Sequence, residues 1–264
     1  MASELKGRYD SSNRASCHES KVAVNKESSV DVPGVMLEIT NLKKSFRDPN
    51  GALLPILDIP RFSMKAGEQV VLRGESGCGK TTLLHTISGL IRADSGTIHL
   101  DGIELTKFSE AGRDRIRASL IGYVFQTFNL LPAFTALENV KLGMTFARKK
   151  AAASRAVELM EKVGLKDRMH YRPGQLSVGQ QQRVAVARGL ANNPRLLLAD
   201  EPTANVDPAN QSKIIQLIQD VCQQESVGLL MVTHSDEVAN RFKRVVRLEE
   251  INLAVSRERI LNEV

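Results

Sequence analysis

Apolar residues follow two different rhythms along this chain. Continuous runs at residues 70–72, 196–199 and 229–232 each lead directly into polar or glycine-rich sequence. Runs of this length are typical of central parallel strands that are covered on both faces. Elsewhere apolar residues recur every three or four positions, which indicates helices with one buried side. These sets are Val157, Met160 and Val163; Val184, Ala187 and Ala191; and Ile214, Leu217, Ile218 and Val221. The two patterns together predict an α/β fold with a mostly parallel sheet.

The bulk composition adds only broad limits. Hydrophobic residues make up 42% and charged residues 25% of the 264 positions, as in ordinary globular proteins. No apolar run approaches the roughly 20 residues that a membrane-spanning helix needs. The three cysteines, Cys17, Cys78 and Cys222, are widely spaced, which indicates a reducing compartment and no disulfide framework.

Residues 1–34 differ from the rest of the chain. They are polar, rich in serine and of mixed charge. They lack the apolar core of a signal peptide, and their acidic residues argue against a transit peptide. We expect them to form a disordered extension.

The net charge of +6 does not by itself identify a partner. The excess is dispersed, with local basic groups at residues 113–117 and 148–150. Such groups suit phospholipid or nucleic acid, but an ordinary solvated helix face is the simpler interpretation.

The most informative stretch follows the first apolar run. Residues 74–81 fit the pattern G-x-x-x-x-G-K-[ST], and residues 82–87 continue with helical spacing. A strand, a glycine-rich loop and a helix in this order cradle the phosphates of ATP or GTP. The glycines let the backbone take positive φ, and the helix N-terminus attracts anions. The predicted nucleotide-binding residues here are Gly74, Glu75, Ser76, Gly77, Cys78, Gly79, Lys80, Thr81 and Thr82.

Three residues of this loop have a more specific expected chemistry. Lys80 places a positive charge on the β- and γ-phosphates, and Thr81 offers a hydroxyl to Mg²⁺, which prefers oxygen ligands. Cys78 allows two interpretations. It is either a tolerated small residue or a thiol whose pKa is lowered beside Lys80 and the helix start.

The other two apolar runs end in ionisable residues. Asp200 and Glu201 follow one run, and His234 follows the other after a single threonine. Because open α/β sheets bind ligands at the carboxyl ends of their strands, we expect these side chains to lie beside Lys80. Asp200 then suits Mg²⁺, Glu201 suits a general base that polarises water, and His234 suits a contact with the γ-phosphate.

Two further segments carry helix-start signals. Ser177 can cap the helix that follows it, so this N-terminus is either a second anion site or a capped helix only. Asp207 precedes Pro208, a strong start signal that does not exclude a second role for Asp207.

These ordered motifs resemble those of ABC-transporter ATPase subunits, from about residue 36 to about residue 248. The resemblance implies that residues 74–82 are the Walker A loop and that Asp200 and Glu201 are the Walker B aspartate and the catalytic glutamate. It implies that Gln126 is the Q-loop glutamine, which contacts Mg²⁺ and communicates with a membrane partner.

The resemblance assigns four further positions. Residues 176–180 match the signature motif, Asp207 falls in the D-loop, and His234 matches the switch histidine. Phe46 occupies the position where the family stacks an aromatic ring on adenine.

The same resemblance implies a dimer that closes around two ATP molecules, either a homodimer or a pair of related subunits. In such a dimer Ser177, Gly179 and Gln180 of one subunit approach the γ-phosphate held by the other. Lys80, Glu201 and His234 then serve hydrolysis, with ATP and Mg²⁺ as the cofactors.

Residues 125–140 resemble most the ATPases of the lipoprotein-release, macrolide-export and cell-division group. Members of this group act with a membrane permease, which implies a peripheral place on the cytoplasmic face of the inner membrane. Phe128, Leu130, Leu131 and Phe134 form an apolar group beside Gln126 that suits a permease helix or local core packing. No nucleic-acid partner is expected.

Other classes fit less of the sequence. A soluble ABC ATPase acting on DNA or ribosomes agrees with the basic charge, but such proteins carry coiled-coil insertions, zinc-binding cysteines or a second cassette. A cell-division regulatory ATPase is a further alternative. A GTPase leaves the signature motif and Phe46 without a role. A subunit unable to hydrolyse ATP is disfavoured because Lys80, Asp200, Glu201 and His234 are intact.

The resemblance also implies the fold and its boundaries. We expect a P-loop ATPase core over residues 35–258, an antiparallel β region with strands at 36–40 and 61–64, and a helical subdomain at about 126–175. Two positions depart from the family. Val178 replaces a glycine, which predicts slower hydrolysis, and Glu249-Glu250 replaces an Asp-Gly turn.

Overall fold

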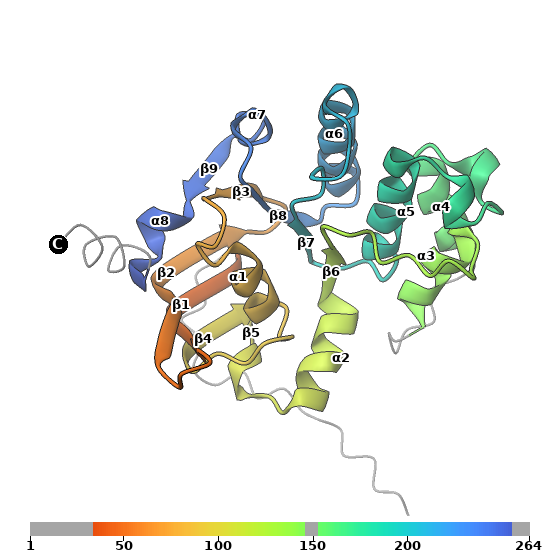
Figure 1. The fold of residues 1–264 in the computed structure, drawn as a ribbon. Coiled ribbons are helices and arrows are strands. Elements are labelled where there is room, and N and C mark those ends of the chain that lie inside the picture. The colour runs from red at the N-terminus through yellow and green to blue at the C-terminus, as the bar shows by residue number, and fades with distance from the viewer. Residues whose placement is uncertain (1–33, 146–152, 255–264) are drawn as a thin grey trace, which may run out of the picture. The chain divides into compact units, whose positions relative to one another are not determined.

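The computed structural model describes residues 34–145 and 153–254. Residues 1–33 of the predicted extension, the basic group at 148–150 and residues 255–258 of the predicted ATPase domain lie outside the described residues. The domain boundaries therefore stay predictions. The described residues form two sheets with helices between and around them (Figure 1).

One sheet is antiparallel. It consists of β1 (Val35–Arg47), β2 (Leu53–Lys65), β4 (Ser95–Leu100) and β5 (Ile103–Glu104), in the order β2-β1-β4-β5. The predicted strands at 36–40 and 61–64 pair with each other and are the inner parts of two longer strands. The longer β1 carries Phe46 to the far end of this ribbon, where it pairs with Leu54.

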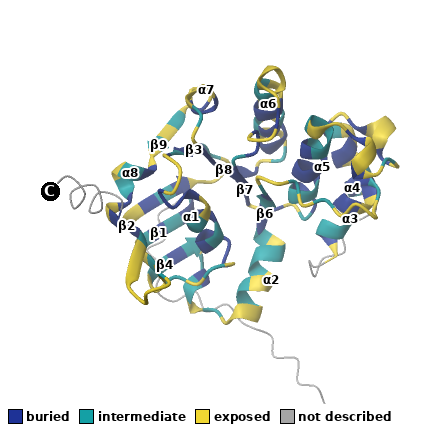
Figure 2. Cartoon of the chain, in the orientation of Figure 1, coloured by how far each residue is buried: buried dark blue, intermediate teal, exposed yellow. Residues whose placement is uncertain are grey.

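The other sheet is parallel. Its strands are β3 (Gln69–Arg73), β6 (Ile121–Val124), β7 (Leu196–Asp200), β8 (Gly228–Thr233) and β9 (Arg244–Arg247), in the order β6-β7-β8-β3-β9. Every pairing within it is parallel. The three continuous apolar runs of the sequence are β3, β7 and β8, and all residues of β7 and β8 are buried (Figure 2).

The alternation of side chains along these strands divides the core in two. Val70, Leu72 and Val232 pack with α1 (Lys80–Ile87) and the antiparallel sheet. Val71 and Met231, on the opposite face, pack with α5 (Val178–Leu190) and α6 (Pro208–Gln224). Burial on both faces explains why these strands are apolar at every position.

The remaining helices are short. They are α2 (Glu110–Leu120), α3 (Ala136–Met144), α4 (Ala153–Lys162), α7 (Asp236–Ala239) and α8 (Leu248–Ile251), with 3₁₀ turns η1 (Leu105–Lys107), η2 (Lys166–Arg168) and η3 (Pro173–Gln175). The Glu249-Glu250 departure from the family pattern forms part of α8. Within residues 34–145 and 153–254, no helix has both the length and the apolar character needed to cross a membrane.

The segment between β6 and β7 is helical, as expected. Here α3 and α4 pack against α5 around Val140, Met160 and Val184, all fully buried. The helix predicted from the spacing of Val157, Met160 and Val163 is α4, with Val163 directly after its end. Met160 and Val163 are buried, and Val157 is partly buried.

Candidate functional site

The carboxyl ends of four parallel strands meet at one edge of the sheet. The loop 74–79 follows β3, Gln126 lies two residues after β6, Glu201 follows β7, and His234 follows β8. The topology therefore gathers side chains that are up to 160 residues apart in sequence (234 less 74). This edge also receives the N-terminus of α1.

Two glycines give the phosphate loop its shape. Gly77 and Gly79 have φ of 84° and 98°, a region that residues with a Cβ rarely adopt. Gly79 is the N-cap residue of α1, so the left-handed turn ends where the helical N–H groups begin. The prediction of positive φ is confirmed at these two positions.

Gly74 is different, and the prediction of positive φ there is wrong. Close packing requires a glycine at position 74, since a Cβ there would lie 2.5 Å from Cys78 Sγ and 3.0 Å from Glu249 Oε1. The Gly74 N–H donates to the Thr233 carbonyl at 3.3 Å, which continues the strand pairing into the loop.

Burial decides between the two interpretations of Cys78. The side chain is buried, and this burial raises the pKa of its thiol despite the nearby Lys80 ammonium. The lowered pKa is therefore wrong, and Cys78 acts as a small packing residue.

The Lys80 side chain is buried at the centre of the site. Its Nζ donates to the carbonyls of Gly74 at 2.8 Å and Glu75 at 2.7 Å. It also lies 3.5 Å from Glu201 Oε1. The ammonium is thus fixed between the phosphate loop and the end of β7.

Thr81 and Asp200 bring two oxygen donors together. Thr81 Oγ1 donates to Asp200 Oδ1 at 3.2 Å. Burial raises the pKa of Asp200, although the Thr81 hydrogen bond acts in the opposite direction. Burial and the Asp200 charge also raise the pKa of Tyr123, a β6 residue that sequence reasoning did not select.

These oxygens fit a magnesium ion that obtains its other ligands elsewhere. In the described ranges no group of three or more His, Cys, Asp or Glu side chains is arranged to hold a metal ion. A hydroxyl beside a carboxylate is instead the donor set expected where phosphate oxygens and water complete an octahedron.

Glu201 is held in an unusual backbone conformation, with φ of 42°. Its N–H donates to the Val232 carbonyl at 3.1 Å, and its own carbonyl accepts from Ala204 N–H at 3.1 Å. The carboxylate Oε2 lies 2.5 Å from His234 Nδ1. Positive φ in a residue with a side chain is a strained feature that such contacts must maintain.

A cavity of about 500 Å³ opens over this edge. Most of the predicted residues line it: Phe46, Ser76, Gly77, Gly79, Lys80, Thr81, Thr82, Gln126, Glu201 and His234. Ile56 lines it as well and was missed, because an isoleucine among other apolar residues of a strand carries no signal beyond packing. Asp200 does not line the cavity itself but accepts a hydrogen bond from Thr81, which does.

Four predicted residues lie apart from this cavity. Ser177 caps α5 in a capping box with Gln180, and Asp207 caps α6 ahead of Pro208, as predicted. Ser177 is exposed, and a Cβ added to Gly179 would meet nothing within 4 Å. Nothing within the described part of this chain therefore requires a glycine at position 179.

The apolar group beside Gln126 is partly exposed. Leu131 and Phe134 are each 40% exposed, while Leu130 packs against the helical core. The Arg188 guanidinium donates to the carbonyl of Phe128 at 2.7 Å, and burial lowers the pKa of this arginine. The loop that presents the apolar side chains is thus tied to α5.

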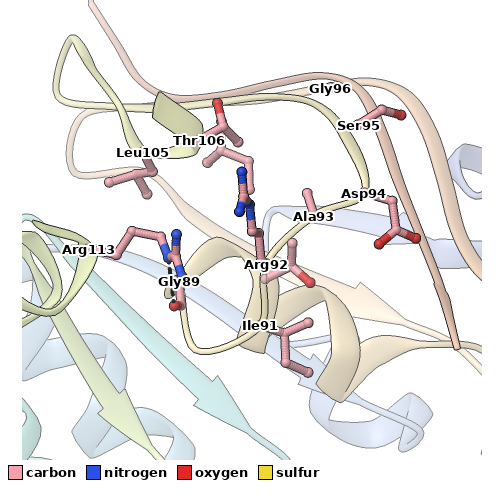
Figure 3. A pocket seen from close by; sticks show the side chains of 12 residues that line it. Gly89, Ile91, Arg92, Ala93, Asp94, Ser95, Gly96, Leu105, Thr106 and Arg113 are labelled. Carbon is pink, nitrogen blue, oxygen red and sulfur yellow. Dashed lines mark hydrogen bonds between the residues drawn. The ribbon is translucent and has the colours of Figure 1, made fainter. Parts of the chain in front are cut away.

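A second cavity, of about 150 Å³, lies at the opposite end of α1 (Figure 3). Arg113 of the basic group in α2 borders it and donates from Nε to the Gly89 carbonyl at 3.3 Å. Arg113 also donates to the Phe108 carbonyl at 2.9 Å, so it serves packing as well as facing solvent. None of the predicted nucleotide-binding residues lines this cavity.

Comparisons with known proteins agree with this arrangement. A family model described as ABC transporter matches residues 57–204. The lipoprotein-releasing system ATP-binding protein LolD 2 of Caulobacter vibrioides is 43% identical over 84% of this chain and 98% of its own length. LolD of Hyphomonas neptunium is 39% identical, over 81% of this chain and 95% of its own.

Two further matches support the same conclusion. The uncharacterized ABC transporter ATP-binding protein YvrO of Bacillus subtilis is 42% identical, over 83% of this chain and 96% of its own. A dimeric structure of the ATP-binding cassette MJ0796 with ADP and Pi superposes with a TM-score of 0.73 at 36% identity, covering 80% of this chain and 94% of that one.

Proposed function

Because this chain belongs to the ABC transporter family as an ATP-binding and ATP-hydrolysing subunit, we propose that the cavity beside residues 74–81 is its ATPase site. The observation that carries the proposal is the convergence of Lys80, Glu201 and His234. They come from α1 and two strand ends, and the Glu201 carboxylate lies between the other two.

The phosphate loop and its neighbours bind the nucleotide. The N–H groups at the start of α1 and the Lys80 ammonium attract the phosphates. The phosphate oxygens compete with the Gly74 and Glu75 carbonyls for the Lys80 ammonium. Phe46, exposed at the cavity rim, offers its ring to the adenine base. Thr81, Asp200 and Gln126 would hold Mg²⁺, which would supply positive charge beside the phosphates.

Hydrolysis proceeds by attack of water on the γ-phosphorus. Glu201 orients this water and accepts its proton, and the bond from the γ-phosphorus to the bridging oxygen of ADP breaks. Lys80 stabilises the negative charge that develops on the phosphate oxygens. His234 fixes the Glu201 carboxylate and contacts the γ-phosphate.

The signature residues act on a second subunit. Ser177 is exposed at the N-terminus of α5, where backbone N–H groups favour an anion. The open space around Gly179 supports an approach by a phosphate from outside the chain. We therefore assign Ser177, Gly179, Gln180 and Asp207 to an ATP-bound dimer interface.

The membrane partner is a permease that docks on Leu131 and Phe134. These exposed side chains lie on the loop after Gln126, whose backbone carbonyl accepts from Asn205 Nδ2 at 3.0 Å. Docking is thus linked to the nucleotide site and to the segment before Asp207. The likeness to LolD supports a system of the lipoprotein-release type on the cytoplasmic face of the inner membrane.

A pull-down from native membranes tests this function. Tagged Glu201→Gln protein with ATP is expected to retain a permease with few membrane helices and a large extracytoplasmic domain. Glu250→Gln, a change at an exposed residue of α8, is expected to leave hydrolysis intact. It serves as the matched control and should retain less of the permease. Recovery of ribosomes or DNA-bound proteins without a membrane protein would overturn the transport assignment.

A further inference from the structure

The short helix α8 packs against the back of the phosphate loop. Leu248 at its start is fully buried, and its Cβ lies 3.4 Å from the position that a Cβ on Gly74 would take. This helix stands where the chain departs from the family pattern, at Glu249-Glu250.

Glu249 makes a direct bond to the loop. Its Oε1 accepts from the Glu75 N–H at 2.9 Å. A backbone N–H bonded to a carboxylate is a charge-assisted hydrogen bond, which is stronger than one between neutral groups. This bond fixes the peptide unit between Gly74 and Glu75. The carbonyls of both residues also accept from Lys80 Nζ.

Asn252 anchors the same segment from the other side. It is fully buried, and its Nδ2 donates to the Ile56 carbonyl at 2.8 Å and to the Cys78 carbonyl at 3.3 Å. Its Oδ1 accepts from the Asp58 N–H at 2.8 Å. One amide therefore joins β2, the phosphate loop and the end of α8, using both its donor and its acceptor capacity.

Cys78 and, less closely, Glu249 occupy the space that a side chain at position 74 would need. A Cβ there would lie 3.0 Å from Glu249 Oε1 and 2.5 Å from Cys78 Sγ. The loop and α8 thus lie so close together that a side chain at position 74 would be crowded by both Cys78 and Glu249.

We propose that Glu249 is a positioning residue for ATP, which holds the loop 74–79 and, through it, the Lys80 ammonium in the geometry that binds phosphate. The inference rests on the proposed function of this loop. Glu249 itself does not line the cavity that we assign to the nucleotide. Without its bond, Glu75 and Gly74 sample other conformations, and ATP must order them on binding at a cost in affinity.

The test compares three single variants of the full chain. Glu249→Ala removes the acceptor, and Glu249→Gln keeps an oxygen that can accept from Glu75 N–H. Glu250→Ala is the matched control, since Glu250 is exposed on the same helix. Each is titrated with the β,γ-imido analogue of ATP and Mg²⁺, and steady-state kcat and KM for ATP are measured in parallel.

Glu249→Ala is expected to raise the Kd of the analogue and the KM for ATP about 3- to 10-fold, the scale of one hydrogen bond. The kcat at saturating ATP should stay within about twofold, because bound ATP orders the loop. Glu249→Gln should restore most of the affinity, and Glu250→Ala should bind like the unchanged protein.

A purely structural role predicts something else. Unfolding at a lower temperature with Kd and KM unchanged in Glu249→Ala would overturn the inference. So would a loss of affinity in Glu249→Gln equal to that in Glu249→Ala. Failure of the unchanged protein to bind the analogue would instead contradict the proposed ATPase site.

Discussion

The carboxylate of Glu201 has neighbours on both sides, Lys80 Nζ at 3.5 Å and His234 Nδ1 at 2.5 Å. Its backbone φ of 42° lies in the left-handed region. Activation of water by Glu201 depends on how precisely these contacts hold its carboxylate.

Replacing Glu201 with Gln is expected to slow ATP turnover about 10²- to 10⁴-fold, because the amide cannot accept the proton of water. Phosphate release at saturating ATP measures the rate. The variant should still bind the β,γ-imido analogue, since the loop and Lys80 are unchanged. Turnover at the normal rate would show that another group is the base.

Val178 offers a second test at this scale. It is 44% exposed at the first position of α5, beside Ser177, and its branched side chain restricts approach to the N–H groups there. Val178→Gly is therefore expected to raise turnover about 2- to 5-fold, equivalent to less than about 1 kcal/mol in the barrier. Val178→Ala should fall between the two. An unchanged rate of ATP turnover in both variants would show that Val178 does not slow hydrolysis.

At the scale of elements, an ion-pair network joins α4 to the end of α6. Arg155 and Lys162 both contact Glu225, and both also contact Glu158 on α4 itself. Burial alone would raise the pKa of Glu225, but the hydrogen bonds from the two cations leave it below the ordinary value of 4.5. The network ties the helical segment to the parallel-sheet core.

Glu225→Gln is expected to lower the free energy of unfolding by about 1–3 kcal/mol at pH 7, because two charge-assisted bonds lose their acceptor charge. Glu158→Gln is the control, since Glu158 is 49% exposed and an exposed pair contributes at most about 1 kcal/mol. Urea unfolding measures both. Equal effects would show that the Glu225 contacts add nothing beyond a surface pair.

The same network predicts a pH dependence with a definite sign. Because folding lowers the pKa of Glu225, its contribution is fully present above the ordinary value of 4.5 and is lost as pH falls through the lower folded value. The stability difference between the unchanged protein and Glu225→Gln should therefore shrink below pH 4.5. A difference that stays constant from pH 7 to pH 3 would contradict this account.

Helix starts were the elements that sequence predicted best. Ser177 and Asp207 cap α5 and α6 as expected, because a capping bond involves residues only three positions apart. The lengths of β1 and β2 were underestimated. Their outer residues carry no alternating pattern, and pairing with each other extends the ribbon.

At the scale of the whole molecule, the proposed function predicts that a second subunit completes the ATPase site. Glu201→Gln protein with ATP is expected to form a stable dimer, seen as a doubled mass by light scattering. Adding Ser177→Arg should abolish this dimer, because a bulky side chain then occupies the approach to the partner's phosphate. Adding Ser119→Arg, an exposed serine on α2, should leave it intact. A dimer that survives Ser177→Arg would place the interface elsewhere.

The sequence alone determined the local chemistry of this protein. Several features could be predicted from sequence because each depends on neighbours within a few positions. They are the loop 74–82, the carboxylates at 200–201, His234 and the capped helix after Ser177. The buried strands could also be predicted from local sequence, since burial on both faces requires an apolar residue at every position.

Only the tertiary structure decided how these parts act on one another. Glu249 and Asn252 bond to the phosphate loop across 174 positions of sequence, and Ile56 lines the same cavity. No local pattern signals these contacts. The raised pKa of the Cys78 thiol and the reason for Gly74 likewise come from packing. Burial and long-range hydrogen bonds depend on the whole fold, so they are settled only when the two sheets and α8 come together around the loop.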